Sequence, residues 1–553
     1  MRKLLCHVDY KIISLAIFLF VSLTACLGYL QLLLNLSFAI PAVPVIAFAV
    51  SVYFIEKEAY TSDAYVYLFL VLLIGALEAY FMDVSWDGQW YHMQAVRSIV
   101  AGWNPYWSNE LFGVTGAVWI NSYPKATWVF GAELYQLTDS LNIGKMYQLL
   151  FAVANFLLVW DIAKSFMAKN KWRLVTAFLL AFNPVVSAQI FSYYVDGTLY
   201  STMLAIACVA FLWSKEQERS NYFYSVLLVL LTAFLVNLKF TALAYAGLEW
   251  LCILLLYYFY HRQLFLSCFL ASVLAICFSV MVIGFNPYIT NIMHHGHPFW
   301  PVRGEYSINV MAAGGDDEFL NQSRVTKLIE ATFSPSYNHE MSMDQIRYKI
   351  PGNVYASEIR ALTKTDTRMG GFGIWFSLGV ILAAIGSAYL LKFHNKNFKL
   401  YKPWLLVIAW LLLSVIINPE SWWARYAPQF YVVFLLMAFL TVKGCQNQRG
   451  KFIGIAAVVV LFLNSMFCFV IHVGYEGAMQ IQIVKAMYAA RSVAPIEVYS
   501  SGNFDSALVN YFQRYDIPYH VTYIDEGFEK QNIVPGVPKG DLYWMQHFTT
   551  FEA

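Results

Sequence analysis

Two carboxylates, Asp83 and Asp87, lie four residues apart directly after an apolar stretch of the sequence, and aromatic side chains follow them closely. Residues at this spacing share one face of a helix. A carboxylate within hydrogen-bond reach of a hydroxyl group can act as a general base, and desolvation beside aromatic rings raises its pKa toward a useful range. We therefore predict that Asp87 and Asp83 are catalytic; the alternative is that both only cap helices.

Three basic residues are candidates for binding a phosphate. Lys239 lies between two apolar stretches, where a charge indicates function unless the side chain snorkels to the interface. Arg425 lies in a turn with two tryptophans, and its guanidinium suits a phosphate; the alternative is a pair with Glu420. Lys125 is the third candidate, with an ordinary solvated lysine as its alternative.

A group of histidines, His294, His295 and His297, suggests metal binding, but its spacing is not the regular one of a metal site on a helix. The acidic run 316–318 is expected to be a solvated turn, with divalent-ion binding as the alternative. We therefore predict no metal ligand and no certain cofactor, and keep a divalent cation, Mg²⁺ or Mn²⁺, as an alternative.

The composition identifies the setting of these residues. Of the 553 residues, 59% are hydrophobic and 13% are charged, whereas soluble domains carry about 25% charged residues. The formal net charge is +2, with no concentrated basic face of the kind that binds nucleic acid. A water-soluble enzyme and a nucleic-acid-binding protein are both excluded.

The apolar stretches predict an all-α polytopic membrane protein with about 13 transmembrane helices, within a range of about 11–14. The expected spans are 12–28, 33–54, 65–82, 146–163, 174–190, 197–213, 221–237, 241–259, 264–285, 372–391, 403–417, 428–442 and 452–474.

Lys and Arg residues crowd the short loops on the side of the N-terminus, which predicts a cytoplasmic N-terminus. Residues 1–474 then form a transmembrane module with two long outer loops, at about 83–145 and 286–371. Residues 475–553 form an extracytoplasmic domain, in which Ile496–Tyr499 and Tyr519–Ile524 alternate like strands and Ser506–Tyr515 has helical spacing. The expected location is a bacterial inner membrane.

The segment from Asp87 to His92 resembles the first outer loop of the GT-C superfamily of membrane glycosyltransferases, which places an acidic residue and an aromatic residue just after a membrane helix. Here the motif follows the third expected span, whereas many members carry it after the first. The resemblance implies a GT-C-like fold with juxtamembrane helices. It also implies a donor sugar on a polyprenyl phosphate and a glycan or lipid acceptor outside the membrane.

On this reading Asp87 is the base, Asp83 is a second acid, and Lys239, Arg425 and Lys125 bind the donor phosphate. A single base would favour inversion at the sugar. The residues expected to contact the sugar or the acceptor are Trp86, Trp90, Tyr91, His92, Tyr123, Asp196, His297 and Trp422. For Asp196 the alternative is an ordinary Asp-Gly turn.

Two other functions stay open. A surface-polysaccharide polymerase or O-antigen ligase would rely on outer-loop arginines, which are present at Arg97, Arg303, Arg324, Arg347, Arg360 and Arg368. A transporter or flippase would show charges within its spans and paired repeats, and the sequence shows almost none of the first and no repeat.

Overall fold

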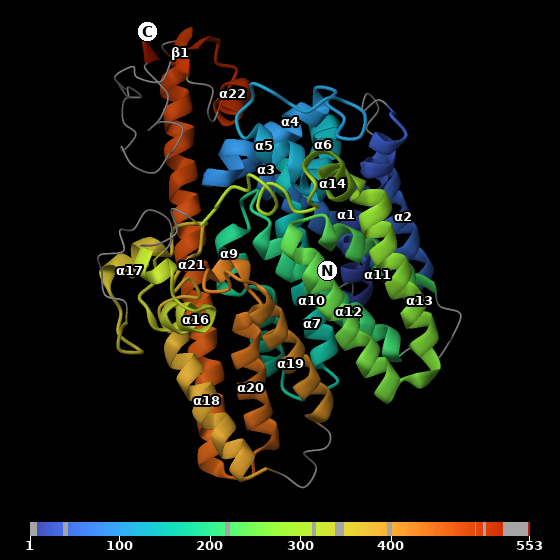
Figure 1. Cartoon of the computed structure of the whole chain (residues 1–553), viewed down its shortest axis with the longest axis vertical. Helices are drawn as coiled ribbons and strands as arrows, with labels where there is room; N and C mark the ends of the chain where they lie inside the picture. The colour runs from blue at the N-terminus through green and yellow to red at the C-terminus, as the bar shows by residue number, and fades with distance from the viewer. Residues whose placement is uncertain are drawn as a thin grey trace.

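The computed structural model describes residues 8–36, 42–215, 222–311, 317–337, 348–394, 401–492, 494–500, 505–523 and 551–552. Within them the chain is mostly helical (Figure 1). Among these residues, seven helical segments are long and apolar enough to cross a membrane, which makes the chain compatible with a multi-pass membrane protein. They are α1 (Tyr10–Leu33), α3 (Thr61–Tyr80), Ile143–Ala163 with α7 (Tyr147–Ala163), α10 (Asp196–Lys215), α12 (Phe240–Tyr260), Arg262–Ile283 with α13 (Phe265–Cys277), and α21 (Gln448–Ser492).

The described part of the chain also contains shorter apolar helices: α11 (Tyr222–Val236), α18 (Phe376–Lys392), α19 (Lys402–Ile417) and α20 (Phe430–Gly444). Helix α2 (Ala42–Glu58) falls on another expected span. The expected span 174–190 contains two helices, α8 (Asn170–Ala181) and α9 (Pro184–Gln189). The break arises because Asn183 caps α9 and Pro184 cannot donate the hydrogen bond that would continue α8.

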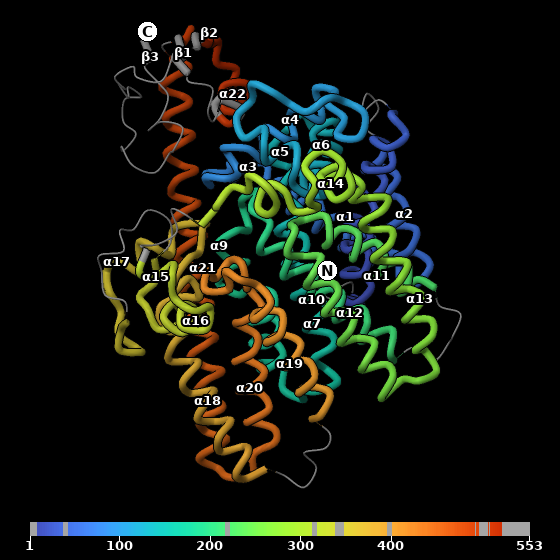
Figure 2. Tube along the Cα trace, in the orientation of Figure 1, coloured from blue at the N-terminus to red at the C-terminus, as the bar shows by residue number. Residues whose placement is uncertain are grey.

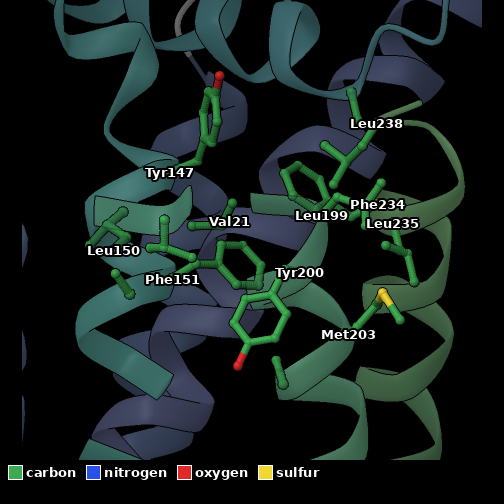
Figure 3. Close-up of a cluster of buried hydrophobic side chains, with 14 of the residues drawn as sticks. Val21, Tyr147, Leu150, Phe151, Leu199, Tyr200, Met203, Phe234, Leu235 and Leu238 are labelled. Carbon is green, nitrogen blue, oxygen red and sulfur yellow. The ribbon is translucent and has the colours of Figure 1, made fainter. Parts of the chain in front are cut away.

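The helices form two groups. In the first group α1 lies at the centre and is buried along most of its length. It packs against α2, α7 and α11, and Figure 3 shows Val21 of α1 among side chains of α7, α10 and α11. The ring of Phe151 lies 5.3 Å from that of Phe18 and 5.5 Å from that of Phe234. Helices α10 and α12, whose first residues lie near the site, both pack against α11 of this group.

The second group contains α18, α20 and α21, with α19 packed against α20 and against α12 of the first group. A Cβ atom on Gly379 of α18 would lie 2.5 Å from the side chain of Leu461 of α21. The absence of a side chain at this position therefore allows the two helices to approach closely, as small residues do between membrane helices.

Short helices join and cover the two groups at one end. They are η2 (Gly88–His92), α4 (Met93–Val100), α5 (Ala117–Ser122), α6 (Ala126–Thr138), η6 (Phe285–Ile289), α14 (Thr290–His295), α15 (Asp317–Leu320), α16 (Arg324–Phe333), α17 (Ala356–Ala361) and η8 (Ala424–Tyr426). In Figure 1, α4, α5 and α6 lie together near the top of the view, whereas α16 and α17 lie beside α21 above α18.

The C-terminal part begins inside a helix. Helix α21 continues to Ser492, so the expected boundary at 474/475 falls within it. Strands β1 (Ile496–Ser500) and β2 (Tyr519–Tyr523) follow, joined by α22 (Asp505–Arg514) and paired in parallel with Ile496 opposite Tyr519. Strand β3 (Phe551–Glu552) pairs with β1 in the antiparallel sense, and Figure 2 shows these strands at the far end of α21. The strands and the helix lie where the sequence alternation predicts them, except that Ile524 lies outside the described residues.

This C-terminal part contacts the segment that leads to Asp87. The hydroxyl of Tyr511 in α22 donates to the carbonyl of Asp83 (3.2 Å), and the backbone N–H of Met82 donates to Oε1 of Gln480 in α21 (2.8 Å). Residues from α21 and α22 thus hold two adjacent residues of the short loop between α3 and η2.

Candidate active site

A guanidinium group surrounded by carboxylates forms the centre of the site. Arg425 lies in the 3-10 turn η8 between α19 and α20. Its Nε atom is 2.9 Å from Oδ1 of Asp366, and its Nη1 atom is 3.2 Å from Oδ2 of Asp87 and 3.6 Å from Oδ2 of Asp196. Three segments that are far apart in the sequence therefore meet at one arginine.

Two of the three carboxylates lie at the start of a helical element, and the third lies in a loop. Asp87 directly precedes η2, Asp196 is the first residue of α10, and Asp366 lies in the loop between α17 and α18. Acidic residues are favourable at helix N-termini because they offset the helix dipole. The same placement directs Asp87 and Asp196 toward the shared arginine.

Asp366 has two further partners. Its Oδ1 atom accepts a hydrogen bond from Nε1 of Trp423 (3.2 Å), and its Oδ2 atom lies 3.0 Å from Nη2 of Arg368. The N–H of Arg425 Nε is not directed at Oδ1, so that contact is ionic and leaves the Trp423 bond undisturbed.

A second cation completes the group. Nζ of Lys239, the N-cap residue of α12, lies 2.6 Å from Oδ1 of Asp196 and 3.7 Å from the centre of the Tyr426 ring. Burial lowers the pKa of Lys239, and the charge of Asp196 acts in the opposite direction. The ion pair and the cation–π contact together hold this lysine in place.

We call Asp87, Asp196, Asp366, Lys239, Arg368 and Arg425 the charged cluster. It contains three acids and three bases, so their formal charges cancel. Buried charges are tolerated when they are paired, and the arrangement meets that condition. The carboxylate of Asp87 is 20% exposed, against 3% for Asp196 and 6% for Asp366, so Asp87 is the acid most open to a ligand.

The surroundings of Asp87 change the pKa of its carboxyl group. Burial raises its pKa, the contact with Arg425 lowers it, and the like charges of Asp366 and Asp196 raise it again; the net direction is upward. Burial lowers the pKa of Arg425, but the carboxylates, led by Asp366, more than offset it, and the guanidinium stays charged. Asp87 is thus a carboxylate with increased basicity next to a permanent cation.

Aromatic rings line the charged cluster. The Cζ atom of Arg425 lies 4.8 Å from the ring centre of Tyr194, 5.1 Å from that of Tyr426 and 5.2 Å from that of Trp423. The ring of Tyr91, four residues after Asp87, stacks on that of His92 at 4.2 Å, and burial followed by the charge of Asp87 raises the pKa of Tyr91.

Three more of the predicted contact residues lie around these rings. Tyr123 packs 6.4 Å from Tyr91, and Trp90 packs edge-on against Tyr91 at 5.7 Å. Trp86 is the residue before Asp87 and lines a pocket described below.

Asp83 lies apart from the charged cluster and has a structural environment. Its side chain is fully buried and accepts hydrogen bonds from the backbone N–H groups of Ser85 and Tyr193, both at 2.7 Å. A Cβ atom on Gly88 would lie 2.0 Å from Oδ2 of Asp83, so the turn requires glycine there. Burial raises the pKa of Asp83. In this structure Asp83 supports the loop that carries Asp87, and its catalytic role stays a prediction.

Lys125 is also structural. Its Nζ atom donates to the carbonyls of Asn121 (3.0 Å) and Tyr123 (2.7 Å) and to Oδ1 of Asn286 (2.6 Å). All three N–H groups are used and the residue is fully buried, so Lys125 joins two loops here, and its contact with a phosphate stays a prediction.

Three other expected contact residues point elsewhere. His92 accepts a hydrogen bond at Nδ1 from Nε1 of Trp128 (2.6 Å), and burial lowers its pKa to about 3, so it is a neutral packing residue. Nδ1 of His297 accepts from the backbone of Phe299 (3.1 Å), away from the charged cluster. Trp422 is buried and donates to Glu420 (2.7 Å).

Glu420 does not pair with Arg425. Its carboxylate accepts from Trp422 and lies 3.5 Å from Nζ of Lys327. The alternative in which Arg425 only ties down its own turn is therefore wrong, because the guanidinium faces the three aspartates.

No group of three or more His, Cys, Asp or Glu side chains is arranged to hold a metal ion within the described residues. His294 and His295 both approach Glu110, at 3.6 Å and 3.5 Å, and the ring of His295 stacks on Trp300. Asp316 lies outside the described residues.

A pocket adjoins the charged cluster on the side of α21. Its lining includes Trp86, Tyr194, Thr363, Asp366 and Glu476. Because Asp366 and Tyr194 also contact Arg425, the pocket and the charged cluster share a wall.

Sequence reasoning missed Asp366 and the contacts of Tyr194, Trp423 and Tyr426. The sequence did contain a feature that could have identified Asp366: it lies with Arg368 shortly before an apolar helix, as Asp87 lies shortly after one. The predicted residues Asp87, Asp196, Lys239 and Arg425 do come together.

The sequence matches no protein-family model and no curated protein.

Proposed function

We propose that this protein is a GT-C-like membrane glycosyltransferase that moves a sugar from a polyprenyl-phosphate-linked donor to a glycan or lipid acceptor on the extracytoplasmic side. The observation that carries the proposal is the contact between Asp87 and Arg425, with Lys239 close by, at the ends of apolar helices. A carboxylate that could serve as the base thus lies with two cations at the ends of apolar helices.

In the proposed reaction, the acceptor hydroxyl oxygen attacks the anomeric carbon of the donor sugar. The bond between that carbon and the phosphate oxygen breaks, and its electron pair stays on the phosphate. Asp87 accepts the hydroxyl proton, which its raised pKa favours. Attack opposite the leaving phosphate gives inversion.

Arg425 and Lys239 stabilise the negative charge that develops on the leaving phosphate. Both cations are already bound to carboxylates, so the phosphate would exchange with an aspartate rather than enter an empty cationic site. Asp87, the most exposed of the three acids, is the one that Arg425 would release. Donor binding would then free the base for the acceptor.

The same proposal places the N-terminus in the cytoplasm of a bacterial cell and about thirteen spans in its inner membrane. A divalent cation would be a further source of positive charge. Its contribution is measured by comparing transfer after EDTA treatment with transfer after Mg²⁺ or Mn²⁺ is restored.

The test compares Asp87→Asn with Asp139→Asn, a matched change at an exposed aspartate. Lipid-linked sugars and surface glycans are measured by mass spectrometry in cells lacking the gene and carrying each variant. We expect Asp87→Asn to match the deletion and Asp139→Asn to match the wild type. Full transfer with Asp87→Asn would refute the proposed base.

The mass of the product separates the proposal from a polysaccharide polymerase or ligase. One sugar added to the acceptor supports the proposal, whereas a whole chain added supports the alternative, which Arg368 in the charged cluster favours.

One observation favours the transporter alternative. Glu249 lies in the apolar helix α12, is 1% exposed, and has no hydrogen-bond partner for either oxygen among the described residues. Buried carboxyls within spans mark ion pathways in transporters. Substrate flux in liposomes that occurs without sugar transfer, and stops with Glu249→Gln, would support that function instead.

A further inference from the structure

We infer that Gln189, the last residue of α9, is a positioning residue for the donor phosphate, and this inference rests on the proposed transferase function. Gln189 acts through Asp196, whose carboxylate contacts both Lys239 and Arg425, the two cations proposed to bind the phosphate. The side chain of Gln189 is fully buried, so its effect on a substrate must pass through Asp196.

The orientation of the Gln189 amide follows from its two partners. Its Oε1 atom accepts a hydrogen bond from the backbone N–H of Gly197 (2.7 Å), in the first turn of α10. Because a backbone N–H can only donate, the amide oxygen faces Gly197 and the amide nitrogen faces the other partner. The Nε2 atom donates to Oδ2 of Asp196 at 3.5 Å. One side chain thus holds both the start of α10 and the acid that begins it.

The two oxygens of Asp196 have different partners. Oδ1 lies 2.6 Å from Nζ of Lys239, whereas Oδ2 lies 3.6 Å from Nη1 of Arg425 and accepts the hydrogen bond from Gln189. The contact with Arg425 is longer than a close charge-assisted hydrogen bond, which measures about 2.7–2.9 Å. The amide therefore holds Oδ2 short of close contact with the guanidinium.

The backbone beside Asp196 is held by other contacts. Nε2 of Gln148 in α7 donates to the carbonyls of Ser192 (3.3 Å) and Tyr194, in the loop that joins α9 to α10. These hydrogen bonds do not involve the side chain of Gln189. A substitution of Gln189 should therefore move the carboxylate of Asp196 rather than the loop.

The loose contact between Asp196 and Arg425 matters for phosphate binding. Without the amide, Oδ2 of Asp196 can rotate toward Arg425 and form a close ion pair. A phosphate would then have to displace Asp196 as well as Asp87 from the guanidinium, and its affinity would fall. In the wild type, Gln189 leaves Arg425 available by competing for the same oxygen.

The experiment separates this role from simple support of α10. Gln189→Glu keeps an oxygen for the N–H of Gly197 but changes the group that faces Asp196. When protonated, the introduced carboxyl can donate to Asp196 as the amide does; when ionised, it repels that carboxylate. Gln189→Met removes both hydrogen bonds and adds no charge. Gln513→Glu makes the same chemical change as the first variant at an exposed position.

The probe is undecaprenyl phosphate, and its binding to the purified full chain in nanodiscs is measured from mildly acidic to mildly basic pH. Each affinity is divided by that of the wild type at the same pH, which cancels the titration of the probe. Gln189→Glu should bind nearly as the wild type does at acidic pH. Its relative affinity should fall about tenfold as the introduced carboxyl ionises, the effect of losing one hydrogen bond to a charged group.

The other variants have different expected patterns. Gln189→Met should bind about tenfold more weakly at every pH, because it has no group that titrates. This loss cannot come from repulsion between an added charge and the phosphate. Gln513→Glu should match the wild type throughout.

Two results would overturn the inference. Wild-type affinity at every pH in Gln189→Glu would mean that Gln189 only supports the start of α10, and wild-type affinity in Gln189→Met would mean that Asp196 does not need the amide. If one variant does not fold, the other decides alone.

Failure of the proposed function is recognised separately, by following sugar transfer with mass spectrometry in membranes that contain the full chain. A wild type that binds undecaprenyl phosphate and transfers no sugar refutes the function, while the binding data still test Gln189. A wild type that does not bind undecaprenyl phosphate overturns both.

Discussion

Replacing Arg425 with glutamine removes the cation that three buried carboxylates share. Asp196 keeps Lys239 and Asp366 keeps Arg368, but the ion pair of Asp87 is lost. Removing one partner of a buried pair costs about 3–5 kcal/mol. Because two of the three acids retain a cation, we expect a loss of about 3 kcal/mol in the free energy of unfolding.

The origin of that loss can be separated by a double-mutant cycle with Asp87→Asn. In the Arg425→Gln background, neutralising Asp87 removes the unpaired charge and should restore about 1–3 kcal/mol. Unfolding of the purified protein in mixed detergent–SDS micelles, followed by tryptophan fluorescence, gives the four free energies. Arg303→Gln, a change at an exposed outer-loop arginine, is the control and should have no effect.

Additive effects of the two substitutions, within about 0.5 kcal/mol, would refute the reasoning. They would mean that Asp87 and Arg425 do not stabilise each other, and the site would need another organising contact. A loss as large in Arg303→Gln would show that the measurement reports general surface charge.

Three further predictions concern single residues. Asp366→Asn removes a like charge that raises the pKa of Asp87, so the acidic limb of the pH profile of kcat/KM for sugar transfer should move to lower pH; a shift to higher pH would contradict this. Lys125→Met leaves three oxygens without their donor and should lower stability by about 1–3 kcal/mol in the same unfolding assay, while binding of undecaprenyl phosphate, measured in nanodiscs, stays unchanged. Gly88→Ala places a Cβ atom 2.0 Å from Asp83, so sugar transfer should fall as the loop carrying Asp87 shifts, and wild-type transfer would show that the loop accommodates the methyl group.

Apolar runs predicted the positions of the helices well, because burial and membrane insertion both depend on composition over many residues. They failed where residues that end or begin a helix lie inside an apolar run. Asn183 and Pro184 are such residues, and they separate α8 from α9. They also failed at the end of α21, where polar residues such as Glu476 and Gln480 end the apolar run but continue the helix.

The site was predicted in part. Asp87, Asp196, Lys239 and Arg425 could be selected because charge is scarce near apolar stretches. Their contacts could not be predicted, since Asp87 and Arg425 are separated by 338 positions in the chain. The role of Lys125 was hidden for the same reason: its partner Asn286 lies 161 residues away, and the sequence alone shows only a lysine in a polar loop.

Helix α21 has 45 residues and is therefore about 68 Å long, more than twice the thickness of a bilayer's hydrocarbon core of about 30 Å. Its far half carries Gln480 and leads to Tyr511, which hold the loop before Asp87. A helix more than twice as long as the hydrocarbon core is thick must project beyond that core. In α21 the half that carries Gln480 holds the polar residues, so the loop before Asp87 is supported by a part of the helix that suits water better than lipid.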